Sequence, residues 1–128
     1  MSARYARGMA MMKQLDERQI TAVVNALEDI APDFARLIIE FAFGDVYARP
    51  GLGLRDRQIA TIAALIALGA PPQLEAHLKA GRNVGLAKEE IVEIIMQTAL
   101  YAGFPAGLNA FAAAKTVFTD MKTEGGQA

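Results

Sequence analysis

The chain has 128 residues, of which 53% are apolar and 21% charged, and its formal net charge is −1. This composition is typical of a single globular domain and excludes a disordered chain. Because no dense basic tract is present, nucleic acid is not an expected partner. The absence of cysteine excludes disulfides, thiolate catalysis and cysteine-ligated metals. No apolar run approaches the ~20 residues of a membrane span, and the N-terminus lacks a signal-peptide core, so we expect a cytoplasmic protein without a membrane partner.

The first part of the chain predicts three helices. Residues 4–14 have the spacing of a short amphipathic helix. Asp16 is the predicted N-cap of a second helix, with Gln19 as its capping-box partner. That helix should end before Pro32, which disfavours helical angles in the preceding residue and suits the first turn of a third helix. The predicted apolar face of the third helix consists of Phe34, Leu37, Ile38, Phe41 and Ala42.

The segment from Gly44 to Gly53 predicts an ordered loop. It contains three glycines and one proline in ten residues, a composition that favours tight turns. It would be the longest non-helical connection in the body of the domain. Long ordered loops often line functional sites, so residues near it are candidates for binding.

The second part of the chain predicts four further helices. Their approximate ranges are 55–68, 72–84, 86–102 and 106–121. Glycines at the ends of the first three act as predicted helix stops, and residues 122–128 are expected to fray. Because no segment has a strand pattern, the sequence predicts an all-α domain of six to seven helices.

Three of these helices have more apolar and small residues than one buried stripe can use. The surplus lies at 55–68, 91–102 and 106–118, and the last of these includes Ala110, Ala112, Ala113 and Ala114. A large exposed apolar surface usually marks an interface. We therefore expect a homo-oligomer.

His77 is the only histidine in the chain and the first candidate for chemistry. On a helix it shares a face with Gln73, Leu74 and Gly81, and Gly81 leaves room for a ligand or another helix. Histidine is the usual acid or base near neutral pH. The alternative is a packed or surface histidine that bonds a backbone carbonyl. No metal site is predicted, because no second histidine and no ligand spacing accompany it.

Two arginines flank this histidine in the predicted helices. Arg57 lies in the first turn of the helix at 55–68, where the helix dipole disfavours a cation. It is either held there for an anion or is a surface residue paired with Asp56 or Asp45. Arg82 projects about 140° around the helix from His77, so the two could border one cavity only at its edges. The alternative for Arg82 is a solvated residue near a helix end.

Glu40 and Arg49 flank the predicted loop. Glu40 is either a buried carboxylate with a perturbed pKa or an exposed residue of the third helix. Arg49, followed by Pro50 and Gly51, is typical of a turn.

Six stretches stand out together: Glu40–Leu52, Arg57, Leu65–Gly69, His77, Asn83–Leu86 and Tyr101–Phe111. They resemble the carboxymuconolactone decarboxylase family, a group of small all-helical proteins that includes the alkylhydroperoxidase D-like enzymes. The resemblance implies that family's helical bundle as a single domain over residues 1–128, with a core at 32–120 and an N-terminal helical extension at 4–30.

The family has a peroxidase branch, whose motif is C-x-x-C-x-x-x-H, and a decarboxylase branch. Counted back from His77, the two cysteine positions hold Ala70 and Gln73. Without a thiolate to attack peroxide, thiol peroxidase activity is excluded. The chain therefore resembles the decarboxylase branch.

The resemblance implies decarboxylation of a small γ-carboxylated lactone in aromatic catabolism, without a cofactor. His77 would stabilise the enolate or act as general acid, and Arg57 would bind a carboxylate. It also implies a hexamer or a trimer. The alternative is a non-catalytic oligomeric helical protein that binds a small acidic ligand or a partner. The predicted substrate-binding residues are Arg49, Arg82, Glu40, Tyr101 and Asn109.

Overall fold

The computed structural model describes residues 2–125, with side chains as far as residue 123. It divides into two compact units, Met1–Leu54 and Arg55–Ala128. Each has its own apolar cluster. The described residues contain helices and connections but no strand, which confirms the all-α fold class.

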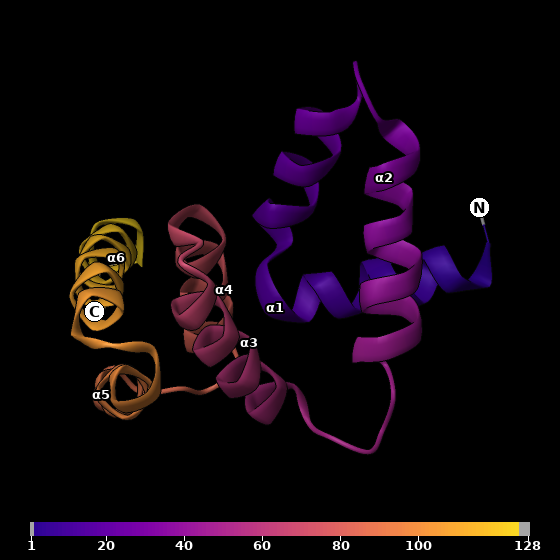
Figure 1. Ribbon diagram of the computed structural model, residues 1–128. Coiled ribbons are helices and arrows are strands. Elements are labelled where there is room, and N and C mark those ends of the chain that lie inside the picture. Colours follow the sequence, from indigo (N-terminus) through magenta and orange to yellow (C-terminus); the bar gives the residue numbers. More distant parts are fainter. Residues whose placement is uncertain (1, 126–128) are drawn as a thin grey trace. The chain divides into compact units, whose positions relative to one another are not determined.

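The first unit consists of α1 (Ala3–Leu27), α2 (Pro32–Leu37) and the π-helix η1 (Ile38–Tyr47). Figure 1 shows α2 and η1 as one continuous helical rod beside α1. A bend divides α1 at Asp16, which has extended backbone angles (φ −162°, ψ 105°). The Asp16 carboxylate accepts the backbone N–H of Arg18 at 3.1 Å, so it caps the second arm. The two predicted helices and the N-cap at Asp16 are thereby confirmed.

The predicted loop from Gly44 to Gly53 is wrong in its first four residues, because η1 continues to Tyr47. Gly44 is buried inside η1 and does not form a turn. A β-carbon on Gly44 would lie 2.4 Å from the carbonyl oxygen of Arg4 in α1. This glycine therefore lets two helices approach closely. From the sequence alone, such a glycine cannot be told apart from one that forms a turn.

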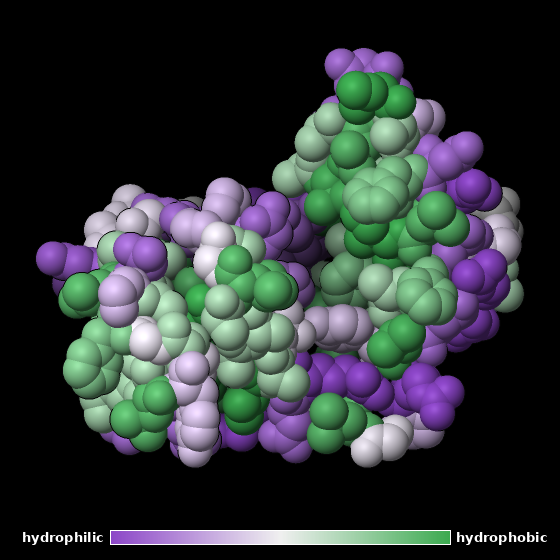
Figure 2. All heavy atoms as spheres, in the orientation of Figure 1, coloured by the Kyte–Doolittle hydropathy of each residue, from purple (hydrophilic) through white to green (hydrophobic). Residues whose placement is uncertain are grey.

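The predicted apolar face of the third helix does not lie in the core of the first unit. Phe34 and Phe41 are 57% and 59% exposed, and Leu37 is exposed as well. The residues buried on this rod are Ala35, Ile39, Glu40 and Gly44. This face includes Gly44, whose missing side chain lets the backbones of α1 and η1 meet. Figure 2 shows apolar side chains gathered on the face of the α2–η1 rod that is in view.

The core of the first unit is small. Met12 and Ile20 of the two arms of α1 pack with Ile39 of η1. Partly buried side chains complete the cluster: Tyr5, Met9, Val24 and Phe43.

The second unit consists of four helices, and their predicted ranges are confirmed to within a few residues. They are α3 (Leu54–Leu68), α4 (Pro71–Asn83), α5 (Lys88–Ala102) and α6 (Phe104–Gly125). The expected fraying is wrong for residues 122–125, which continue α6, and residues 126–128 lie outside the described part of the chain. All four helices contribute to one apolar core, formed by Ile62, Ile66, Leu74, Leu78, Leu86, Ile91, Ile95, Ala110, Ala113, Ala114 and Val117.

Glycines end three of these helices in conformations with positive φ. Gly85 (φ 106°) follows α4, where the N–H of Leu86 donates to the carbonyl of Gly81 at 2.9 Å. The N–H of Gly85 donates to the carbonyl of Arg82 at 3.2 Å, which completes a Schellman motif. Gly69 ends α3 and Gly103 ends α5. The predicted helix stops are confirmed at all three positions.

Candidate active site

A buried glutamine holds the single histidine of the chain. Gln58 of α3 is fully buried, and His77 of α4 is half-buried. The Nδ1 atom of His77 lies 3.0 Å from the Oε1 atom of Gln58. Because an amide oxygen only accepts, Nδ1 carries a proton in this arrangement, and the neutral ring has its lone pair on Nε2. The predicted alternative, a histidine bonded to a backbone carbonyl, is not the contact found here.

Burial lowers the pKa of His77 below its ordinary value, because it disfavours the charged imidazolium. Gln58 is uncharged and adds no attraction that would offset this effect. The neutral imidazole is therefore the favoured form of the free protein at neutral pH.

Gln58 was not among the residues predicted from the sequence. It lies on one helical stripe with Ile62 and Ile66, both also buried. The sequence did contain a signal for this residue. Gln58 precedes Ile62 and Ile66 by four and eight residues, so it lies on the same face of the helix as these apolar side chains.

The space beside Gly81 is already filled. A β-carbon there would lie 2.9 Å from Cδ1 of Leu86 and 3.2 Å from Cδ1 of Ile62. The missing side chain thus admits a neighbouring helix, the second of the two uses predicted for this glycine. It leaves no room for a ligand at that position.

Arg57 is half-buried and immediately precedes Gln58 in the first turn of α3. Its neighbour Arg55 forms an ion pair with Glu90 of α5 and a longer one, 3.8 Å, with Asp56. Glu90 also accepts the backbone N–H of Ala87 at 2.9 Å. That bond, and then the contact with Arg55, lower the pKa of Glu90.

The ion pair of Arg55 with Glu90 joins the first turns of α3 and α5, next to the turn that carries Arg57 and Gln58. Neither Arg55 nor Glu90 was a predicted site residue. A pair 35 residues apart in the sequence leaves no local pattern from which it could have been found.

Arg82 contacts the end of its own helix. Its Nη1 atom donates to the carbonyl oxygen of Leu86 at 2.9 Å, just beyond the Schellman motif. This bond satisfies a carbonyl after the helix and stabilises the connection to α5. Arg82 thus has a structural contact within its own unit, and its role in substrate binding stays a prediction.

The other two predicted residues of the second unit lie on its surface. Tyr101, near the end of α5, is 87% exposed, and Asn109 of α6 is also exposed. Gly103 and Phe104 form the corner between them. No hydrogen bond or ion pair of the described residues links Tyr101 or Asn109 to Gln58 or His77.

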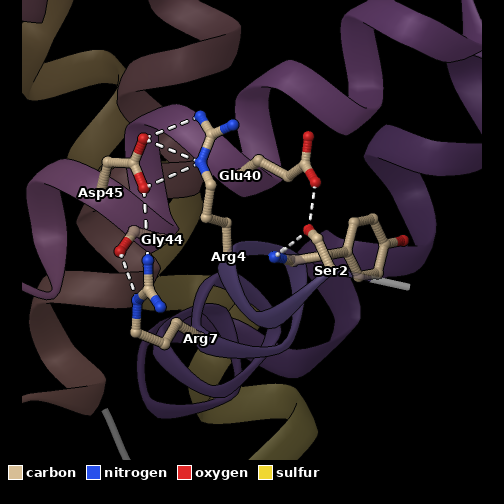
Figure 3. A network of polar contacts seen from close by, with 7 residues as sticks. Ser2, Arg4, Arg7, Glu40, Gly44 and Asp45 are labelled. Atoms are coloured by element: carbon tan, nitrogen blue, oxygen red, sulfur yellow. Dashed lines mark hydrogen bonds and ion pairs between the residues drawn. The ribbon is translucent and has the colours of Figure 1, made fainter.

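Glu40 and Arg49 belong to the first unit. Glu40 is 8% exposed, so the predicted alternative of an exposed residue is wrong and the residue is buried. It accepts a hydrogen bond from the hydroxyl of Ser2, whose oxygen also caps α1 through the N–H of Tyr5 (Figure 3). Arg49 is exposed in the connection after η1, and its N–H donates to the carbonyl of Val46 at 3.1 Å.

A second polar contact in the first unit involves Asp45. Arg4 donates to both of its carboxylate oxygens, with the shortest distance 2.8 Å, and Arg7 contacts it at 3.4 Å (Figure 3). Arg7 also donates to the carbonyl of Gly44 at 3.2 Å. The hydrogen bond from Arg4 is the main reason that the pKa of Asp45 is lowered. These contacts join the start of α1 to η1.

Within residues 2–125, no group of three or more histidine, cysteine, aspartate or glutamate side chains is arranged to hold a metal ion. Over the same part of the chain, no helix has the length and apolar character needed to cross a membrane.

Comparison with known proteins identifies the family. The family model described as "Carboxymuconolactone decarboxylase family" matches residues 32–116, which span both units. The chain is 40% identical to a 4-carboxymuconolactone decarboxylase of Acinetobacter baylyi (strain ATCC 33305 / BD413 / ADP1), covering 92% of this chain and 89% of that one.

Two other relatives are similar over most of their length. A nitrosuccinic acid decarboxylase, npaB, of Metarhizium robertsii (strain ARSEF 23 / ATCC MYA-3075) is 34% identical, covering 80% of this chain and 74% of its own. An uncharacterized 15.0 kDa protein of Paracoccus denitrificans, from the nqo9-nqo10 intergenic region, is 31% identical, with coverage of 79% and 77%. The match to the family model and these identities show that the chain belongs to the carboxymuconolactone decarboxylase family.

Proposed function

We propose that this protein is a carboxy-lyase that decarboxylates a small γ-carboxylated lactone in aromatic catabolism without a cofactor. Two relatives named as decarboxylases, at 40% and 34% identity, support the reaction class. The observation on which the proposal rests is the half-buried His77, held by a buried amide through one ring nitrogen only. The other nitrogen remains to act on a substrate.

The chemistry requires little from the protein beyond positioning and proton transfer. The bond between the γ-carbon and its carboxylate breaks, and carbon dioxide leaves. The electron pair delocalises through the ring double bond into the lactone carbonyl, which becomes an enolate. A proton then adds to carbon, so the substrate itself is the electron sink.

His77 is the proposed donor to the enolate or general acid. Because Nδ1 already donates to Gln58, only Nε2 is available, and it donates a proton only from the imidazolium. Burial disfavours that form in the free protein. A bound anionic substrate would favour it, since an opposite charge within about 4–6 Å stabilises a cation. Substrate binding and protonation of His77 are therefore coupled in this proposal.

Arg57 is the proposed carboxylate-binding residue. Its guanidinium carries a permanent charge and a planar set of donors that matches a carboxylate. It is half-buried and adjoins Gln58 in α3. Removal of this charge should raise KM more than it lowers kcat if Arg57 binds ground state and transition state alike.

The test is turnover of 4-carboxymuconolactone and of nitrosuccinic acid by the purified protein, followed as release of carbon dioxide. We expect His77→Ala to lower kcat by about 10²–10⁴-fold, the usual contribution of a general acid or base. Lys115→Ala, at an exposed position of α6, is the control and should keep the activity of the unmodified chain. Circular dichroism checks that each variant is folded.

Two results would contradict the proposal in different ways. Activity of His77→Ala within about threefold of the unmodified protein would remove His77 from its role. If the unmodified protein turns over neither acid nor related carboxylactones, the alternative of a non-catalytic protein that binds a small acidic ligand is favoured.

A further inference from the structure

We propose that Gln58 is a positioning residue that fixes the Nδ1–H tautomer of His77 and thereby makes Nε2 its only proton-exchanging atom. The assignment rests on the 3.0 Å contact between Nδ1 and Oε1 and on the complete burial of Gln58. Its catalytic meaning rests on the function proposed above. The tautomer itself can be measured without any substrate.

Burial gives the amide its orienting power. A surface glutamine exchanges its partners with water, but the side chain of Gln58 has no access to solvent. Buried polar groups in proteins are nearly always hydrogen-bonded, and loss of a partner leaves a costly unsatisfied atom. The carbonyl oxygen of Gln58 therefore favours the ring orientation in which Nδ1–H points at it.

The charge of the partner matters as much as its position. A carboxylate at position 58 would attract the imidazolium and raise the pKa of His77, whereas an amide accepts the same hydrogen bond without a charge. Gln58 thus orients the ring but leaves it neutral in the free protein. Protonation can then depend on the charge that a substrate brings.

The ionisable side chains of α3, α4, α5 and α6 do not control the protonation of His77 in place of Gln58. Burial is the only cause of the lowered pKa of His77, and none of the neighbouring charges contributes a resolved change. Arg55 is paired with Glu90 and Asp56, and Lys79 lies 3.9 Å from Asp120. Apart from His77 and Tyr101, the ionisable residues of α3, α4, α5 and α6 with described side chains are Arg55, Asp56, Arg57, Glu75, Lys79, Arg82, Lys88, Glu89, Glu90, Glu93, Lys115, Asp120 and Lys122.

The experiment uses the fact that His77 is the only histidine. In the ¹⁵N-labelled full chain, every imidazole signal belongs to this residue, so its tautomer and its titration are read directly by NMR. The variants are Gln58→Glu, which adds a charge at the contact, and Gln58→Met, which removes the acceptor at similar volume. Gln97→Glu, at an exposed position of α5, is the control for the same change of charge elsewhere.

We expect the unmodified protein to show the Nδ1–H tautomer above the pKa of His77. Gln58→Glu should raise that pKa by about one unit or more, as an adjacent opposite charge typically does, while Gln97→Glu leaves it within about 0.3 units. Gln58→Met should lose the dominance of the Nδ1–H form. If Gln58→Glu does not fold, the tautomer of the unmodified protein and of Gln58→Met decides the matter.

An Nε2–H tautomer in the unmodified protein would overturn the proposal, as would equal titration of Gln58→Glu and Gln97→Glu. If decarboxylation is observed, the pH profile of kcat in Gln58→Glu should move upward with the NMR pKa. A confirmed tautomer in a protein without activity would contradict the proposed function and leave the role of Gln58 in orienting the ring intact.

Discussion

The α-carbon of Gly8 faces the carbonyl oxygen of Ile39 so closely that a β-carbon on Gly8 would lie 1.9 Å from that oxygen. The relation is mirrored at Gly44, where a β-carbon would meet the carbonyl of Arg4. Two glycines thus allow α1 and η1 to touch through their backbones. The face of the α2–η1 rod that contains Gly44 therefore packs against α1, while Phe34 of α2 and Phe41 of η1 stay exposed.

Gly8→Ala should therefore destabilise the protein, even though alanine is the better helix former by about 1 kcal/mol. The added methyl group meets backbone atoms, which cannot rotate away, and overpacking of this kind typically costs about 1–3 kcal/mol. The measurement is the free energy of unfolding in urea.

Gly51→Ala is the matched control for this substitution. Nothing lies within 4 Å of its β-carbon position, and its φ is not positive. It should be neutral or stabilising by up to about 1 kcal/mol, because it restricts the unfolded chain. An equally stable Gly8→Ala variant would mean that the two helices are not in backbone contact.

Gly103 should be as intolerant of alanine for a different reason. Its backbone angles, φ 105° and ψ 153°, fall in a region that essentially only glycine occupies. Forcing a β-carbon into it costs about 1–3 kcal/mol, although no neighbouring atom is closer than 3.7 Å to the added carbon. The measurement is the free energy of unfolding in urea for Gly103→Ala and for Gly53→Ala. A loss of stability in Gly103→Ala alone would show that backbone strain, and not the added methyl group as such, is the cause. A change of only a few tenths of a kcal/mol would show that the corner between α5 and α6 relaxes freely.

The stability of the protein should depend on pH through His77. Its folded pKa is lowered from the ordinary 6.5, so the unfolded chain binds a proton more readily. This contribution to stability is present above pH 6.5 and is lost as the pH falls through the folded pKa, at a slope of at most about 1.4 kcal/mol per pH unit. Other groups titrate in the same range, so the quantity to measure is a difference between two proteins.

The comparison is between the unmodified protein and His77→Gln, which cannot titrate at this position. The unfolding free energy of the unmodified protein should fall relative to the variant between pH 7.5 and 5. A constant difference over that range would mean that burial does not lower the pKa of His77.

Association into a homo-oligomer remains a prediction, and the exposed apolar residues around the α5–α6 corner support it. Leu100, Phe104 and Leu108 are 70% to 75% exposed. Sedimentation at micromolar concentration should give a mass above the 13.7 kDa of one chain. Leu108→Glu should shift the distribution toward smaller species, and Thr119→Glu, at an exposed polar position of α6, should not. A single 13.7 kDa species for the unmodified protein would contradict the prediction.

Local patterns in the sequence were sufficient for the helices other than the last turn of η1. The bend at Asp16 and the stops at Gly69, Gly85 and Gly103 depend on capping atoms and backbone angles within a few residues, so they could be found by inspection. The family could be recognised in the same way, from short motifs around His77 and Gly103, and the comparisons confirm it.

The faces of those helices depended on distant contacts. Phe34 and Phe41 follow a regular apolar spacing, yet the packed side of the rod is set by Gly8 and Gly44, which let another backbone approach. Hydrophobic periodicity identifies an apolar face, but it does not tell whether that face lies in the core or on the surface.

The sequence alone determined that the chain is helical, that it has no thiol and that one histidine carries any imidazole chemistry, because these depend on composition and local geometry. Only the tertiary structure decided that Gln58 holds that histidine and that Arg55 pairs with Glu90, since both contacts join residues of different helices. The tautomer and the lowered pKa of His77 follow from burial and from that partner. Neither is a property of the histidine in isolation.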